Sequence, residues 1–450
     1  MEIKERIKQY KEEMIQDLNQ LVSYNSVQDQ SNPMYPFGKE NAKCLKAALE
    51  VAEKCGMSAV NLANYIGYGE IGEGDEVIGV LGHLDIVPVG EGWNTNPLEV
   101  TEIEGKLYGR GVSDDKGALI ASAYAIRILK DMNYPMKKRI RLIMGCNEES
   151  GSACLDYYVK KEGHVDYGFT PDAVFPGVFG EKGMVGGTFH SIKTKILHIE
   201  GGSVSNVVCE RCITEIPLNS CDTEVLKKHF QDNQIQAEII VEQTIQLEVK
   251  GVAAHASTPD LGVNAIAHTM KALQDAGFED DFVDFYMEKI GLSTTGEYCG
   301  VELNDDYGAL TFNNGVISMQ EGTIMGTIDI RFPVTMKAIE IVNALKKGFE
   351  STKGIVKVTR QIEPLFYPKE SVLVTSLLKA YQDVTKDMHS EPVTMGGGTY
   401  AKGIKNCIAF GCEFANENNH IHDANEVLKV ESFLLQVEIY VTALMNLLNL

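Results

Sequence analysis

The segment RIRLIMGCNEES (residues 139–150) joins an apolar run to a polar cluster, and the same pattern occurs twice more in the chain. EVIGVLG (76–82) is followed by HLD, and CIAFGC (407–412) is followed by a stretch that contains NENNHIHDANE. Short apolar runs of this kind are typical of buried parallel strands. Between the first two runs, KGALIASAYAIRILKDM (116–132) carries apolar residues at a helical period. The order strand, helix, strand predicts an α/β domain with a mainly parallel sheet flanked by helices.

The middle of the chain has a different pattern. Strand-like segments (186–202, 237–251 and 322–333) alternate there with helical ones (262–277 and 336–352). This predicts an α+β lid domain, residues 183–367, inserted into the first domain. Residues 1–182 and 368–450 would then form the first domain, which the apolar helix over 431–448 would close.

Length, charge and cysteine content limit the possible functions. A chain of 450 residues with 44% hydrophobic residues can bury more than one core. A formal net charge of −22 argues against a nucleic-acid partner. The ten cysteines have no spacing framework, so we expect reduced thiols, and the Cys209-x-x-Cys212 pair lacks the second pair that a structural zinc site needs.

The N-terminal residues read as an amphipathic surface helix rather than a signal peptide. We see no uncharged run of the ~20 residues that a membrane span needs. The sequence therefore predicts a cytoplasmic protein without a membrane partner.

Acids and histidines cluster where strands or loops of the first domain end. They are His83 and Asp85, Asp114 and Asp115, Glu148 and Glu149, Asp172, and His420 and His422. Each alone has a simple structural explanation, as a loop histidine or a solvated acid. Together they form a nitrogen and oxygen ligand set that suits zinc, and the absence of cysteine indicates a catalytic rather than a structural site.

Six segments carry a resemblance to a known family. GHLDIVPVGEGW (82–93), LYGRGVSDDKG (107–117), NEESGS (147–152), TPDAVFPGVFGEKG (170–183), GVAAHAS (251–257) and HDANE (422–426) stand in the family's order. The chain resembles the dinuclear-zinc peptidases that include Xaa-His dipeptidases, carnosinases, tripeptidases, glutamate carboxypeptidases and succinyl-diaminopimelate desuccinylases. It is most similar to the bacterial dipeptidases with a long lid domain.

This resemblance implies two divalent metal ions per chain, zinc first and manganese or cobalt as alternatives. Asp114 would bridge the ions, with His83 and Asp172 on one and Glu149 and His422 on the other. The family's motif register selects Asp114 over Asp115 and His422 over His420. Asp115 would then be a solvent-facing or locally hydrogen-bonding acid. Asp85 would hydrogen-bond the His83 imidazole and fix its tautomer, as metal-bound histidines require.

The resemblance assigns Glu148 as the general base that takes a proton from the attacking water and passes it to the leaving amine. The alternative is an acid stabilised by a helix N-terminus. In the lid, His255 would donate a hydrogen bond to the developing oxyanion. Arg331 and Asn206 would bind a substrate carboxylate, and Thr399 is a further substrate contact or part of a tight turn. Val208-Cys209 replaces the Val-Pro of relatives, which weakens the prediction for Asn206.

The long insert and Asp172, where deacylases of the family have glutamate, favour a dipeptidase that hydrolyses unblocked dipeptides. The resemblance implies a monomer in which His255 acts within its own chain, with a small peptide as the partner. Two alternatives stay open: a deacylase of N-acyl amino acids such as the desuccinylase, and an inactive peptide-binding protein.

Overall fold

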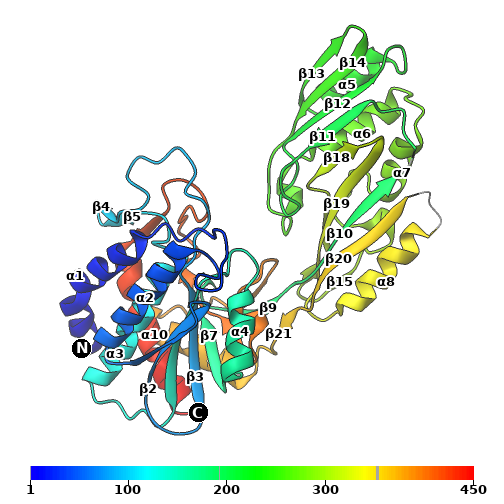
Figure 1. The fold of residues 1–450 in the computed structure, drawn as a ribbon. Helices are drawn as coiled ribbons and strands as arrows, with labels where there is room; N and C mark the ends of the chain where they lie inside the picture. Colours follow the sequence, from blue (N-terminus) through cyan, green and yellow to red (C-terminus); the bar gives the residue numbers. More distant parts are fainter. Residues whose placement is uncertain (1, 192, 351–353) are drawn as a thin grey trace. The chain divides into compact units, whose positions relative to one another are not determined.

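The computed structural model describes residues 2–191, 193–350 and 354–450, which form two compact units (Figure 1). The first unit contains the chain up to Gly180, Tyr367–Val393 and Gly398–Leu450; the second contains Glu181–Phe366 and Thr394–Gly397. The short segment 394–397, which the sequence places in the first domain, belongs to the second unit, where Met395 O accepts the amide N–H of Lys182 at 2.8 Å.

The first unit has the predicted α/β fold. Its sheet runs in the order β1-β2-β6-β3-β7-β23-β9. The central strands are parallel: β6 (Arg139–Gly145), β3 (Val77–His83), β7 (Tyr167–Thr170) and β23 (Cys407–Ala409). Antiparallel strands flank them: β1 (Ser58–Leu62), β2 (Ile66–Ile71) and β9 (Val178–Glu181). Every residue of β3 is buried, as expected for a parallel strand covered on both faces.

Helices cover this sheet (Figure 1). They are α1 (Glu2–Val22), α2 (Lys39–Lys54), α3 (Lys116–Asp131), α4 (Ala153–Glu162), α9 (Val372–Thr385) and α10 (Val430–Leu448). Among the described residues, α10 is the one helix that by length and composition could cross a membrane, and 61% of its apolar stretch is buried inside the structure. Because α10 packs against α3 and α9, its apolar composition is explained by the core of this unit.

The second unit is an antiparallel sheet with helices packed against it. The strand order is β13-β14-β12-β11-β18-β19-β10-β20. The strands are β10 (Gly183–Ser191), β11 (His198–Gly201), β12 (Arg211–Pro217), β13 (Gln236–Val241), β14 (Thr244–Lys250), β18 (Ile317–Gln320), β19 (Thr323–Phe332) and β20 (Ile355–Ile362). The short strand β17 (Thr311–Asn313) also pairs with β19.

The core of this unit lies between the sheet and α5 (Thr223–Asp232), α6 (Ala265–Asp275), α7 (Asp281–Lys289) and α8 (Ala338–Phe349). On β14, the buried Ile245, Leu247 and Val249 alternate with polar residues, which is the pattern of a sheet with one covered face. The helix predicted over 336–352 ends at Phe349, and residues 351–352 lie outside the described residues.

Candidate metal centre

The predicted ligands of the first unit lie where its parallel strands end. His83 is the last residue of β3 and pairs in register with Gly145, the last residue of β6. Glu148 and Glu149 come shortly after β6, and Asp172 comes shortly after β7. The carboxyl ends of neighbouring parallel strands share one edge of a sheet. The strand order β6-β3-β7 therefore brings these side chains together.

The Asp114 carboxylate lies between two imidazoles. Its Oδ1 is 2.9 Å from Nε2 of His83, and its Oδ2 is 2.9 Å from Nε2 of His422. Oε1 of Glu149 lies 3.1 Å from the same His422 nitrogen. A carboxylate that presents one oxygen to each of two nitrogen ligands is suited to bridge a pair of metal ions.

Two sets of side chains can each surround a cation. One ligand atom from each of His83, Asp114 and Glu149 lies within 4.8 Å of the others, and the same holds for His83, Glu148 and Asp172. The first set contains only predicted ligands. The second places Glu148, the predicted base, beside two predicted ligands. This nitrogen and oxygen donor set fits divalent ions such as zinc.

Burial and mutual contacts shift the pKa values of these groups. Burial opposes ionisation of Asp114, but hydrogen bonds to His422 and His83 hold the pKa of Asp114 well below its usual range. Contacts with Asp114 and Glu149 raise the pKa of His422 to about 10. Burial raises the pKa of Glu148 to about 8, and repulsion by other carboxylates adds to this shift. Because a histidine that binds a metal ion must be neutral, His422 would have to lose a proton to act as a ligand.

Asp85 makes hydrogen bonds in this site that differ from the predicted one. Nδ1 of His83 is 2.9 Å from the backbone carbonyl of Asp85, whereas the Asp85 carboxylate lies 3.6 Å away. That carboxylate instead accepts the amide N–H groups of Glu148 and Glu149, at 3.0 and 3.1 Å. The predicted hydrogen bond between the Asp85 carboxylate and the His83 imidazole is therefore wrong. The carbonyl fixes the His83 tautomer, and the carboxylate fixes the loop that carries both glutamates.

Asp115 and His420 are the two residues that the motif register rejects as ligands. Both make other contacts. Asp115 is fully buried, and its Oδ2 accepts the amide N–H of His83 at 3.1 Å. The solvent-facing alternative for Asp115 is wrong, and the local hydrogen bond is present. His420 is exposed, and its amide N–H donates to Oδ1 of Asn418 at 3.1 Å.

In the second unit, the segments that carry Asn206 and His255 are neighbours. The backbone carbonyl of Asn206 accepts the amide N–H of Ala256 at 2.8 Å. Nδ1 of His255 accepts the amide N–H of Ser257 at 3.2 Å and lies 2.7 Å from the Ser257 hydroxyl. Because Nδ1 is an acceptor, the neutral imidazole of His255 carries its proton on Nε2. This is the tautomer that donates a hydrogen bond from Nε2.

Arg331 is buried and forms an ion pair with Asp329. Its Nε and Nη2 donate to the two carboxylate oxygens of Asp329, at 2.6 and 3.2 Å, and its Nη1 donates to Gly396 O at 3.3 Å. Sequence reasoning missed Asp329, although residues two apart on a strand share a face. A guanidinium has five N–H groups, so this pairing orients Arg331 without using them all.

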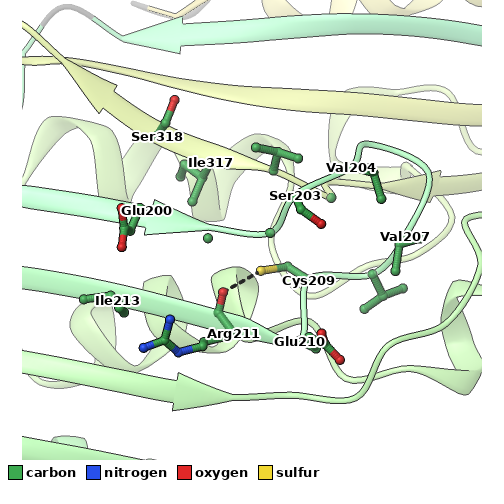
Figure 2. A pocket seen from close by; sticks show the side chains of 15 residues that line it. Glu200, Ser203, Val204, Val207, Cys209, Glu210, Arg211, Ile213, Ile317 and Ser318 are labelled. Carbon is green, nitrogen blue, oxygen red and sulfur yellow. Dashed lines mark hydrogen bonds between the residues drawn. The ribbon is translucent and has the colours of Figure 1, made fainter. Parts of the chain in front are cut away.

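A hollow of about 460 Å³ lies beside the loop after Asn206, between parts of β11, β12 and β18. Figure 2 shows Cys209 in its wall, with Sγ donating to the backbone carbonyl of Arg211 at 3.1 Å. Sγ of Cys212 is 3.7 Å from the Thr214 hydroxyl instead. The two thiols of the Cys-x-x-Cys pair therefore have separate partners.

Thr399 belongs to the first unit and precedes a single helical turn, Tyr400–Gly403. Its side chain is buried, and its hydroxyl accepts the amide N–H of Ala401 at 3.2 Å. The hydroxyl therefore caps this turn, and a contact with substrate stays a prediction.

Residues 79–446 match the family model described as peptidase family M20/M25/M40. The chain belongs to this family. It is therefore a peptidase of the hydrolase class, and the resemblance found in its motifs is confirmed. As in other M20 peptidases, metal ions are required, and the ligand sets around His83 are the candidate site for them.

Named relatives and solved structures are similar to the chain over nearly its whole length. A protein of Staphylococcus epidermidis named "Putative dipeptidase" is 32% identical over 463 residues, covering 98% of each chain. A Staphylococcus aureus protein with the same description is 32% identical and covers 99% of each chain. Human carnosine dipeptidase 1 has a TM-score of 0.59 at 17% identity, covering 100% of this chain and 98% of its own. A dipeptidase from Saccharomyces cerevisiae has a TM-score of 0.59 at 15% identity, covering 100% and 98%. The two structures show that the fold is shared.

The role of Asp85 in this M20 peptidase can be tested by Asp85→Asn. An asparagine keeps the backbone carbonyl that binds His83 but has only one side-chain oxygen for the two amides of Glu148 and Glu149. We expect turnover to fall by about 10- to 100-fold, the usual effect of losing a partner outside the ligands. Steady-state kinetics with excess metal measures this, and wild-type turnover would contradict the role.

Proposed function

We propose that this M20 peptidase is a zinc-dependent dipeptidase that hydrolyses unblocked dipeptides. The observation that carries the proposal is the Asp114 carboxylate, which lies 2.9 Å from each of two histidines beside the Glu148-Glu149 pair. His83 and Asp172 would hold one ion, Glu149 and His422 the other, and Asp114 both. The names of the relatives with 32% identity support dipeptides as the substrate class.

Two bound divalent ions would supply Lewis acidity, which activates water at neutral pH and polarises the scissile carbonyl. Glu148 accepts the proton of the attacking water and transfers it to the leaving amine. The raised pKa of Glu148 suits this task, because a base must take up the proton and also release it. Among the described residues, the Glu148 carboxylate accepts no hydrogen bond, which leaves its oxygens for the proton transfer.

The second unit would supply substrate contacts. His255, with its proton on Nε2, is suited to stabilise the oxyanion. Arg331 and Asn206 would bind the free carboxylate of the dipeptide, and Asp329 would orient the Arg331 guanidinium. A substrate whose free carboxylate is held next to the scissile bond would have to be a short peptide. We further propose that the protein acts as a cytoplasmic monomer, with His255 serving the same chain.

A direct comparison of substrates tests the proposal. Zinc-loaded enzyme is assayed in parallel with unblocked dipeptides and with N-acyl amino acids, including N-succinyl compounds. We expect the dipeptides to be hydrolysed with the higher kcat/KM. Faster turnover of the N-acyl compounds would establish a deacylase instead. Tight dipeptide binding without hydrolysis would show an inactive binding protein.

A further inference from the structure

Glu426 is a fully buried acid that none of the roles above uses. It lies four residues after His422, and its side chain reaches back to the loop that carries Asp114. Oε1 accepts the amide N–H groups of Ser113 and Asp114, at 2.9 and 3.1 Å. Oε2 accepts the amide N–H of Gly111 at 3.0 Å and Nη1 of Arg110 at 2.8 Å.

Further contacts join the same two segments. The backbone carbonyl of Glu426 accepts the amide N–H of Gly109 at 3.2 Å. Nδ2 of Asn419 donates to the hydroxyl of Ser113 at 2.9 Å, also in a buried position. The segment 419–426, which contains His422, is therefore tied to the segment 109–114, which contains Asp114.

The energetics of Glu426 favour a specific role over an incidental one. A buried carboxylate is strongly unfavourable unless hydrogen bonds and an opposite charge compensate it. Here three backbone amides and the buried guanidinium of Arg110 supply that compensation. The carboxylate thus fixes the backbone amides of Gly111, Ser113 and Asp114. It therefore also fixes the point from which the Asp114 side chain extends.

We propose that Glu426 is a positioning residue that sets the distance between the Asp114 carboxylate and the His422 imidazole, so that both can bind one cation. It is not itself a ligand, because its two oxygens are occupied by the four donors. The proposal rests on the proposed function for the identity of the ligands, since Asp114 and His422 are assigned there. Loosening this connection should weaken metal binding while the fold persists.

The test compares three variants of the full chain. Glu426→Gln replaces one acceptor oxygen by an NH2 group, which would face N–H donors. Glu426→Asp keeps the charge but is one methylene shorter. Asp17→Asn is the matched control, since Asp17 is a buried carboxylate of the same unit that binds Lys54 and the hydroxyl of Tyr124 instead. Zinc affinity is measured by competition with a chelating indicator, and the visible spectrum of the cobalt-loaded protein reports the geometry of the site.

We expect both Glu426 variants to bind zinc about 10- to 100-fold more weakly and to change the cobalt spectrum, with the Asp17→Asn affinity unchanged. Weak binding by Glu426→Gln together with wild-type binding by Glu426→Asp would overturn the proposal, because charge alone would then explain the effect. Equal weakening in Asp17→Asn would overturn it as well. If Glu426→Gln does not fold, Glu426→Asp decides: tenfold weaker binding supports positioning, and unchanged binding rejects it.

These measurements need no peptide. Wild-type protein that binds zinc but cleaves no dipeptide would contradict the proposed function and leave the result for Glu426 readable. Conversely, an active dipeptidase whose Glu426→Asp variant binds zinc normally would contradict only the positioning role.

Discussion

Glu148→Ala should leave the metal ions bound and reduce the turnover of a dipeptide by about 100- to 10,000-fold, the range lost with a general base. Glu148 lies in a site where burial raises its pKa to about 8, so the carboxylate can take a proton and return it near neutral pH. Metal content after gel filtration and kcat for one dipeptide are the two measurements. Both are needed, because loss of metal alone would also abolish turnover.

Glu149→Ala is the matched control, since it removes a carboxylate one residue away. Oε1 of Glu149 lies 3.1 Å from Nε2 of His422, so its loss should release a metal ion as well as reduce turnover. The reverse result, an empty site in Glu148→Ala and a loaded site in Glu149→Ala, would show that the roles are exchanged. The grouping of Glu148 with His83 and Asp172 makes this a real alternative.

Much of the first unit can be predicted from the sequence because its signals are local. The apolar runs at 76–82 and 139–146 are the strands β3 and β6, and the helical period over 116–132 is α3 (Lys116–Asp131). Polar residues that follow parallel strands must lie at one edge of the sheet, which explains why His83 and Glu149 meet. The resemblance to the family adds the residues whose convergence no local pattern predicts, such as His422.

The contacts that hold the site in shape could not be predicted in this way. The carboxylate of Asp85 binds amides that are 63 and 64 residues distant in the chain, and Glu426 binds amides more than 300 residues distant. Such pairs depend on where the loops meet after folding. Buried backbone amides need partners, but sequence does not show which acid supplies them. The pair of Arg331 and Asp329 is a different case, because the two residues are two apart on β19 and share a face of the strand.

Asp114→Asn should reduce zinc affinity by at least about 100-fold, more than the loss of a residue outside the ligands. An asparagine keeps one oxygen and replaces the other by an NH2 group, which cannot coordinate a cation. In the structure each oxygen of Asp114 is 2.9 Å from a different histidine, so the substitution would remove one oxygen of the predicted bridge. Zinc titration of the metal-free variant with a chelating indicator measures the effect.

The adjacent acid supplies the control, because Asp115 is as deeply buried and directly follows Asp114. Burial raises the pKa of Asp115 well above its usual range, and asparagine has nearly the same size and shape as this side chain. Its Oδ2 accepts the amide N–H of His83, a contact that the amide oxygen of asparagine can also make. Asp115→Asn should therefore bind two zinc ions with nearly wild-type affinity. If Asp115→Asn loses zinc while Asp114→Asn retains it, Asp115 is the bridging ligand, and the choice made from the motif register is wrong.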